Sequence, residues 1–202
     1  MIKNIIFDMG NVLIKFDRSV FLDAIGVYGE DREILMREVF LSLEWSMMDR
    51  GSLTDKQAAE RMRRRVPERL HKAVDALTFE WERPMLPIDG VEELVRELKA
   101  KGYHLYLISN ASLRQHEYWP LIPGYECFED TVISADVKLV KPQPEIYLYA
   151  MYKFGTRPEE SVFIDDSTPN VEGAVYSGLN GIVFHGDAGE LRRKLRELGV
   201  DC

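Results

Sequence analysis

Five short apolar runs of β-branched and aromatic residues recur along this chain of 202 residues, and helical patterns separate most of them. Polar residues do not alternate within the runs, so both sides of each predicted strand are apolar. Such strands are buried on both faces, as in a parallel sheet covered by its connecting helices. The pattern predicts an α/β fold with a doubly wound, five-stranded parallel sheet. The runs are residues 5–7, 104–108, 131–133, 162–164 and 181–184, and helices are predicted over 91–100, 144–154 and 190–198.

One long segment between the first two predicted strands interrupts this alternation. Thr54 and Gln57 form a capping box at the start of one of its helices, and Pro84 and Pro87 mark the return to the sheet. An all-helical insertion at this point lies above the C-terminal ends of the strands, where open α/β sheets bind ligands. Helices are predicted here over 20–24, 33–47, 54–65 and 70–81, in a helical cap of residues 16–83 inserted into an α/β catalytic core of residues 1–15 and 84–202.

The acidic composition narrows the range of partners. Lys and Arg number 26 and Asp and Glu 34, which gives a formal net charge of −8. Nucleic acids and anionic membrane surfaces favour basic proteins, so neither is expected as a partner. Cys127 and Cys202 are too few for a disulfide framework, and the N-terminal apolar run is too short for a signal peptide or a membrane span. We expect a cytoplasmic protein whose oligomeric state is open, with a monomer favoured.

Groups able to bind phosphate or a cation follow four of the five predicted strands. Because the strands are parallel, their C-terminal ends meet at one edge of the sheet. A nucleophile, hydroxyl and amide donors, a cation and a pair of carboxylates should therefore come together at this edge. These residues are, in chain order, Asp8, Ser109-Asn110, Lys141 and Asp165-Asp166.

This set of groups suits phosphoryl transfer. A carboxylate can attack phosphorus and form a covalent acyl phosphate, which divides one difficult step into two easier ones. Negative charge concentrates on the transferred group, so catalysis is largely positioning and electrostatic neutralisation. Mg²⁺ prefers an octahedral shell of oxygens with a few carboxylates among them, and Asp8, Asp166 and a nearby backbone carbonyl offer such ligands.

The four polar motifs, in this order, resemble those of the haloacid dehalogenase-like hydrolases, in the branch that carries a helical cap after the first motif. The resemblance covers essentially the whole chain. It implies a Rossmann-like core and a Mg²⁺-dependent phosphatase that forms an aspartyl phosphate. The small cap and the lack of a basic surface favour a small phosphorylated metabolite as substrate, such as a hexose 1-phosphate.

The resemblance also implies roles for the residues that hold the phosphoryl group. Ser109 and the Asn110 amide would bind its oxygens. Lys141 would pair with the phosphorylated carboxylate, and Asp165 would steady this lysine or a metal-bound water. Asn170 would brace the loop of the fourth motif.

The metal ligands implied in the same way are the Asp8 carboxylate, which is also the nucleophile, the Gly10 carbonyl and the Asp166 carboxylate. Gly10 departs from the usual pattern of the family, which has a second aspartate there as general acid and base. Such a group is worth about 10²–10⁴ in rate. The stretches around Asp8 and Ser109 are similar to the α-D-glucose-1-phosphate phosphatase group of the superfamily, which carries glycine at this place and is active.

Three explanations of Gly10 are open. The leaving oxygen of the substrate departs without help, as from an anomeric sugar phosphate; another residue supplies the proton, with Asp17 and His116 as candidates; or the site is inactive and binds phosphate only. His116 is also a candidate for substrate binding, whereas Trp119 beside it is expected to pack.

Two further alternatives come from other classes of protein. A metal-free haloacid dehalogenase also uses an aspartate nucleophile and also lacks the second aspartate, but it would have no use for the pair Asp165-Asp166. A catalytically silent phosphate sensor or interaction protein would keep the motifs without turnover. In the helical insertion, Trp45, Met47 and Met48 are expected to pack the bundle, and residues 49–51 form a candidate specificity turn.

Overall fold

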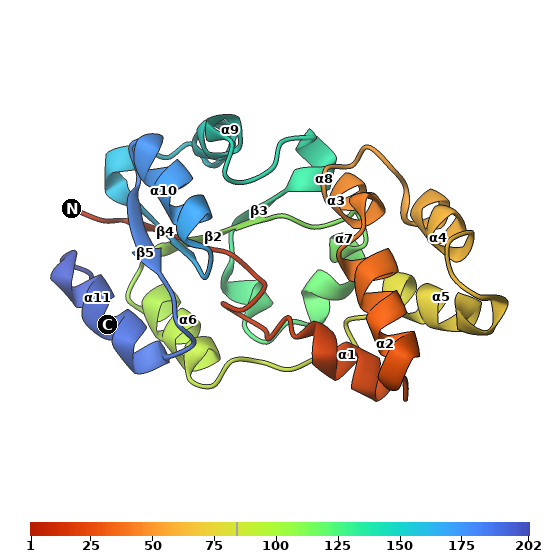
Figure 1. Cartoon of the computed structure of the whole chain (residues 1–202). Helices are drawn as coiled ribbons and strands as arrows, with labels where there is room; N and C mark the ends of the chain where they lie inside the picture. The colour runs from red at the N-terminus through yellow and green to blue at the C-terminus, as the bar shows by residue number, and fades with distance from the viewer. Residues whose placement is uncertain (84) are drawn as a thin grey trace.

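A five-stranded, all-parallel sheet forms the centre of the protein (Figure 1). It is seen in a computed structural model that describes residues 1–83 and 85–202. The strand order is β3-β2-β1-β4-β5, so the first strand lies in the middle and the chain winds outward from it in both directions. This confirms the predicted doubly wound α/β fold. The strands are β1 (Asn4–Phe7), β2 (His104–Ser109), β3 (Asp130–Ile133), β4 (Ser161–Asp165) and β5 (Asn180–Val183).

Successive residues of each inner strand enter two separate hydrophobic clusters, one on each face of the sheet. Ile5 and Phe7 pack with α6 and α11, whereas Ile6 between them packs with α9 and α10. Both faces are thus covered, which is why the strand sequences are apolar without alternation. The covering helices are α6 (Val91–Ala100), α9 (Pro144–Phe154), α10 (Thr168–Tyr176) and α11 (Ala188–Glu197).

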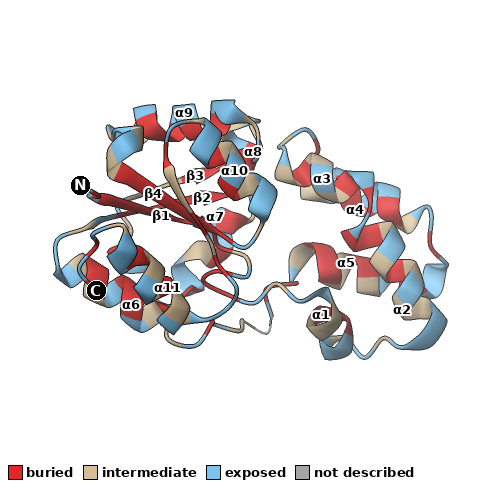
Figure 2. Ribbon diagram, turned by 60° about the vertical axis from the view of Figure 1, so that its left-hand side comes forward, coloured by how far each residue is buried: buried red, intermediate tan, exposed pale blue. Residues whose placement is uncertain are grey.

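The described part of the chain between β1 and α6 forms a bundle of five α-helices that lies to one side of the sheet; we call it the helical part (Figure 2). Aromatic rings fill its centre, with Phe16 in edge-on contact with Phe21 and Trp81 at centroid distances of 5.3 and 5.0 Å. The Trp81 ring also contacts Tyr118, on the sheet side, at 5.2 Å. The helices are α1 (Arg18–Ala24), α2 (Gly29–Leu35), α3 (Leu43–Asp49), α4 (Asp55–Arg63) and α5 (His71–Phe79).

The prediction of one continuous helix over 33–47 is wrong. α2 runs into a π-helical turn, Met36–Phe40, and Ser42 then starts a new helix. The Ser42 hydroxyl accepts a hydrogen bond from the backbone N–H of Trp45 at 3.2 Å, so it acts as an N-cap in the middle of the apolar pattern. The capping box of Thr54 and Gln57 is confirmed.

Three helices that the sequence pattern does not predict follow β2, β3 and β4. The helices after β2 and β3 are single turns, which are too short for a hydrophobic period to be recognised in the sequence. α10 has a weak apolar stripe and begins directly after the polar motif that ends β4. The helices concerned are α7 (Gln115–Tyr118), α8 (Ser134–Val137) and α10, with 3₁₀ turns at Trp119–Leu121, Tyr125–Cys127 and Pro158–Glu160, besides one in the helical part at Glu68–Leu70.

Two linkers join the helical part to the sheet, and they are hydrogen-bonded to each other. The Lys15 N–H donates to the Leu86 carbonyl at 2.7 Å, and the Ile88 N–H donates to the Leu13 carbonyl at 3.1 Å. Ile14 and Pro87 form an antiparallel bridge between these bonds. The division of the chain at residues 15 and 84 stays a prediction, and the predicted boundary residue Pro84 lies outside the described residues.

Two smaller expectations concern the cysteines and membrane spans. Cys127 and Cys202 are both buried, free thiols. Among the residues that the structure describes, no helix is both long and apolar enough to cross a bilayer.

Gly173 in α10 provides a test of how closely this helix packs against the loop that carries Lys141. A Cβ atom at this position would lie 2.5 Å from the Pro142 carbonyl oxygen and 3.0 Å from the Pro142 Cβ. Gly173→Ala is therefore expected to destabilise the fold by about 1–3 kcal/mol, although alanine favours helices by about 1 kcal/mol. Thermal unfolding should show a fall of roughly 2–10 °C in Tm. Glu172→Ala, at an exposed neighbouring position, is the control; a Tm that rises in Gly173→Ala would contradict the packing.

Candidate active site

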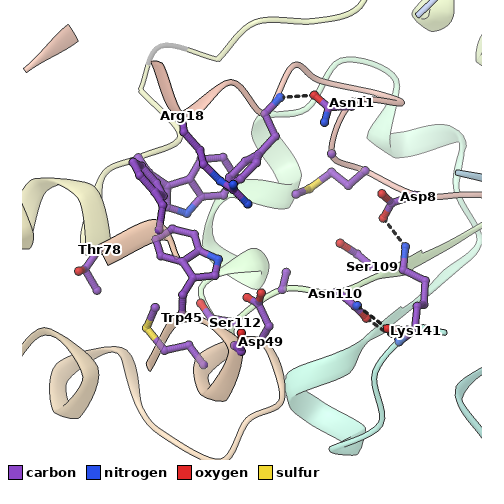
Figure 3. Close-up of a pocket in the computed structure, with 18 of the residues that line it drawn as sticks. Asp8, Asn11, Arg18, Trp45, Asp49, Thr78, Ser109, Asn110, Ser112 and Lys141 are labelled. Atoms are coloured by element: carbon purple, nitrogen blue, oxygen red, sulfur yellow. Dashed lines mark hydrogen bonds and ion pairs between the residues drawn. The ribbon is translucent and has the colours of Figure 1, made fainter. Parts of the chain in front are cut away.

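The four predicted motifs converge at the C-terminal edge of the sheet. Asp8 follows β1, Ser109 ends β2, and Lys141 lies in the loop between α8 and α9 (Figure 3). Asp165 ends β4. Their exposed fractions are 8% for Asp8, 1% for Ser109, 0% for Asp165 and 4% for Lys141. Burial of charged side chains is costly unless they are paired, so this grouping is held together by its own interactions.

The Lys141 ammonium group connects three strands. Its Nζ donates hydrogen bonds to Asp8 Oδ1 at 2.6 Å, to Asp165 Oδ2 at 2.7 Å and to the Ile108 carbonyl at 3.0 Å. The three protons of the ammonium group are thus all used, and each carboxylate has a charged partner. Removing one member of such a buried group leaves an uncompensated charge, which typically costs about 3–5 kcal/mol.

Burial and charge act in opposite directions on this cluster. Desolvation raises the pKa of Asp8 to about 7, although Lys141 lowers it; the Asp165 charge raises it further. Desolvation lowers the pKa of Lys141, but Asp8 and Asp165 outweigh this effect and leave it above its usual value. The lysine therefore stays charged, and it favours the ionised form of Asp8 that a nucleophile requires.

Amide side chains fix the positions of the charged groups. The Asn170 Nδ2 donates to both carboxylate oxygens of Asp165 at 3.1 Å, and the Ser167 N–H donates to its Oδ1 at 2.8 Å. The Asn110 side chain binds the backbone of Lys141 in both directions, accepting from its N–H at 2.9 Å and donating to its carbonyl at 3.0 Å. Asn170 thus braces the fourth motif as expected, while the Asn110 side chain positions the lysine loop.

Three carboxylates lie close enough together to hold a divalent cation. Oxygen atoms of Asp8, Asp165 and Asp166 lie within 4.8 Å of one another. Asp165 is already engaged by Lys141 and Asn170, so Asp8 and Asp166 are the carboxylates available to an ion. Desolvation raises the pKa of Asp166, and the Asn11 amide opposes this by donating to its Oδ2 at 3.0 Å. An all-oxygen donor set of this kind fits Mg²⁺.

The position of the missing second aspartate is not blocked. A Cβ atom at Gly10 would meet only the Phe16 Cβ, at an ordinary contact distance of 3.5 Å. Next to it, Asn11 adopts a left-handed conformation with φ of 55°, and its Oδ1 accepts from the Phe16 N–H at 2.9 Å. Asn11 thereby connects the linker of the helical part with Asp166.

Two predicted site residues lie elsewhere. The His116 Nε2 pairs with the Asp136 carboxylate at 2.9 Å, and both side chains are largely exposed. Asp17 caps α1 by accepting from the Ser19 N–H at 2.8 Å. Neither His116 nor Asp17 is among the residues that line the cavity at the site, so the structure does not bring them to Asp8.

A cavity of about 450 Å³ lies above Asp8, Ser109 and Lys141, and residues of the helical part form its opposite wall. Trp45 and Met48 line it while also packing in the bundle, so the expectation that they only pack was incomplete; Met47 packs against the core. Asp49 also faces the cavity, although the sequence predicted it only as part of a turn. The aromatic side chains of the helical wall are Phe16, Phe40, Trp45 and Trp81, joined by Tyr118.

Comparison with known proteins agrees with the motifs and the fold. The family model for haloacid dehalogenase-like hydrolases matches residues 2–178. The chain belongs to this family of hydrolases, which confirms the predicted superfamily; the particular phosphatase group and the cap type stay predictions.

Three similar proteins illustrate the range of the family. The chain is 29% identical over 124 residues to flavin mononucleotide hydrolase 1 of Arabidopsis thaliana, a match over 56% of this chain and 46% of that protein. It is 27% identical over 181 residues to the pyrophosphatase PpaX of Bacillus cereus, covering 88% of this chain and 80% of the relative. The fold superposes with a TM-score of 0.72 on a family member from Bacteroides thetaiotaomicron, in a complex with magnesium and inorganic phosphate, at 22% identity over 95% of this chain and 99% of the other. Family and named relatives together support an enzyme of the phosphatase type.

Lys141→Met is expected to destabilise the protein in a pH-dependent way. Without the ammonium group, Asp8 and Asp165 face each other in a buried setting, and the pKa of Asp8, no longer lowered by Lys141, rises further above the value of about 3.9 in the unfolded chain. The lost stability is therefore small at low pH and grows as the pH rises through the folded-state pKa of Asp8, to about 3–5 kcal/mol at pH 8.

Urea unfolding at pH 5, 6.5 and 8, with a chelator present, measures this dependence. Lys72→Met, at an exposed position of α5, is the control. An equal loss of stability at all three pH values would contradict the electrostatic account.

Proposed function

We propose that this protein is a Mg²⁺-dependent phosphatase that hydrolyses a small phosphorylated metabolite through an aspartyl phosphate. One observation carries the proposal: a carboxylate at the end of β1 lies 2.6 Å from a buried ammonium group and beside a carboxylate pair, at the base of a cavity. These are the groups that an acyl-phosphate mechanism needs.

Asp8 is the proposed nucleophile. Its carboxylate attacks phosphorus, a new P–O bond forms, and the bond from phosphorus to the leaving oxygen of the substrate breaks. Water then attacks the phosphorus of the aspartyl phosphate, which releases inorganic phosphate and restores Asp8. Lys141 keeps Asp8 oriented and ionised and offsets the negative charge that gathers around it.

Ser109 and Asn110 are proposed to hold the transferred phosphoryl group. Both residues line the cavity beside Asp8. Because the Asn110 side chain is occupied by the Lys141 backbone, its contribution is assigned to its backbone N–H. Asp165 acts on Lys141 rather than on the substrate, since its carboxylate lies within a full set of internal hydrogen bonds.

Asp8, Asp166 and the Gly10 carbonyl are the proposed ligands of Mg²⁺. When bound there, the ion would neutralise charge on the phosphoryl oxygens. Asn11 orients Asp166 through its 3.0 Å hydrogen bond.

The helical part, residues 16–83, is proposed to act as a cap that admits the substrate and excludes water from the reaction. It presents aromatic rings together with hydroxyl and carboxyl groups to the cavity. Rings of this kind bind the apolar face of a sugar, and the polar groups hydrogen-bond its hydroxyls. This supports a sugar phosphate, such as a hexose 1-phosphate, as the substrate.

Removal of the nucleophile or of the metal is expected to abolish activity. Asp8→Asn should lower kcat with 4-nitrophenyl phosphate by at least about 10³-fold, because the amide cannot form the acyl phosphate. EDTA should abolish turnover by the wild type, and added Mg²⁺ should restore it.

Asp201→Asn, at an exposed C-terminal position, is the control for the loss of a charge, and a cooperative thermal unfolding transition shows that the Asp8 variant is folded. Full turnover after either treatment would contradict the mechanism. Halide release from a 2-haloacid, without phosphatase activity, would indicate the dehalogenase alternative instead; turnover of neither substrate would indicate a binding protein.

A screen of phosphorylated metabolites tests the substrate class. We expect hexose phosphates to give a higher kcat/KM than nucleotides or phosphopeptides, because the cavity has a volume of about 450 Å³ and is walled by aromatic rings. A preference for nucleotides or phosphopeptides in this screen would refute the proposed substrate class.

A further inference from the structure

Asp49 is the last residue of α3, and it faces the same cavity as the nucleophile (Figure 3). Asp8 reaches the cavity from the sheet, and Asp49 reaches it from the helical part. A substrate with its phosphoryl group at Asp8 would extend its leaving group toward the helical wall of the cavity, to which Asp49 belongs.

The backbone around Asp49 is fixed by contact with the sheet side. The Ser134 hydroxyl donates to the Asp49 carbonyl, and the same hydroxyl accepts from the Ala111 N–H at 2.9 Å. Gly51, with φ of +68°, lies so close to α8 that a Cβ atom would be 2.1 Å from the Ala135 carbonyl oxygen. The turn of residues 49–51 thus rests directly on the backbone that follows β3, and it holds Asp49 at the wall of the cavity.

The carboxyl group of Asp49 is unoccupied by internal contacts. Within the described ranges, 1–83 and 85–202, its side chain makes no hydrogen bond, and the Ser134 hydroxyl binds its backbone carbonyl. A polar group that is half-buried, without an internal partner and directed into a cavity is available to a ligand.

The surroundings favour the protonated form of this carboxyl group. Desolvation raises the pKa of Asp49 to about 8, the charge of Asp55 raises it further, and Arg18 opposes them. Tyr118 is a further titratable neighbour of Asp49, and burial raises the pKa of its phenol well above the usual value, which keeps it neutral. This environment favours a protonated carboxylic acid at Asp49, on the wall of the cavity opposite the nucleophile.

The other acidic groups of the site are less suited than Asp49 to donate a proton to the leaving group. Asp8 and Asp166 are the proposed nucleophile and metal ligand, and Asp165 is fully engaged by Lys141 and Asn170. Asp55 opens α4, where the helix N-terminus stabilises negative charge. With glycine at position 10, and with Asp17 and His116 outside the cavity, Asp49 is the described group placed to act as an acid on the leaving oxygen.

We propose that Asp49 is the proton donor to the leaving group, and that it replaces from the helical part the aspartate that Gly10 lacks; this rests on the proposed phosphatase function. As the bond from phosphorus to the leaving oxygen breaks, the Asp49 carboxyl proton moves to that oxygen and an alcohol departs. The Asp49 carboxylate then accepts a proton from the water that attacks the aspartyl phosphate. Inorganic phosphate is released, and both Asp8 and Asp49 return to their starting states.

The test compares two leaving groups in one variant. Asp49→Asn keeps the size of the side chain but cannot transfer a proton as an acid. The readout is kcat/KM, which reports the steps up to formation of the aspartyl phosphate and not its later hydrolysis. With an alkyl ester such as glycerol phosphate or a hexose 6-phosphate, kcat/KM should fall by about 10²–10⁴-fold. With 4-nitrophenyl phosphate, whose leaving oxygen needs no proton, kcat/KM should fall less than threefold.

The pH dependence gives a second readout. In the wild type, the ratio of the alkyl to the aryl rate should decrease as the pH rises through about 8, because Asp49 loses its proton there. In Asp49→Asn this ratio should not change with pH. The use of a ratio cancels the titration of groups that affect both substrates.

Asp23→Asn, on the surface of the helical part, is the matched control and should behave as the wild type with both substrates. Equal losses with both leaving groups, or a ratio that still falls with pH in Asp49→Asn, would overturn the role of Asp49 while leaving the phosphatase assignment intact. A wild-type protein that hydrolyses neither ester would overturn both proposals together.

Discussion

The ammonium group of Lys141 between the Asp8 and Asp165 carboxylates is the interaction on which the site depends. It links residues from the ends of three adjacent strands through contacts of 2.6–3.0 Å. Each partner is itself oriented by amide or backbone groups, so the loop carrying the lysine must follow one path across the sheet edge. The close packing of Gly173 in α10 against Pro142 also fixes the position of the loop that carries the lysine.

The sequence was sufficient for the parts of the fold that follow from topology. Continuous apolar strands require a covered parallel sheet, and parallel strands require that Asp8, Ser109 and Asp165 emerge at one edge. The direction in which a loop side chain points has no such pattern. His116 turns outward to pair with Asp136, and Asp17 is used as an N-cap, because local hydrogen bonds decide both orientations.

The helical part shows the same limit. The apolar pattern over 33–47 continues through a break that a single serine hydroxyl produces, so periodicity alone merged two helices. The 49–51 turn could be named from the sequence, but its contact with Ser134 and Ala135 joins residues more than eighty positions apart. Only the packed structure reveals that Asp49 and Asp8 share a cavity, and that the charged edge of the sheet faces a wall of aromatic rings.

The paired linkers have a mechanical consequence. Since Leu13, Lys15, Leu86 and Ile88 are hydrogen-bonded across the two segments, any displacement of the bundle relative to the sheet would bend both linkers together. Asn11 lies beside these linkers; it accepts a hydrogen bond from the Phe16 N–H and donates one to Asp166. Such a displacement would therefore change the orientation of a proposed cation ligand. By thermodynamic reciprocity, an ion whose affinity depends on the orientation of Asp166 would also bias the position of the bundle.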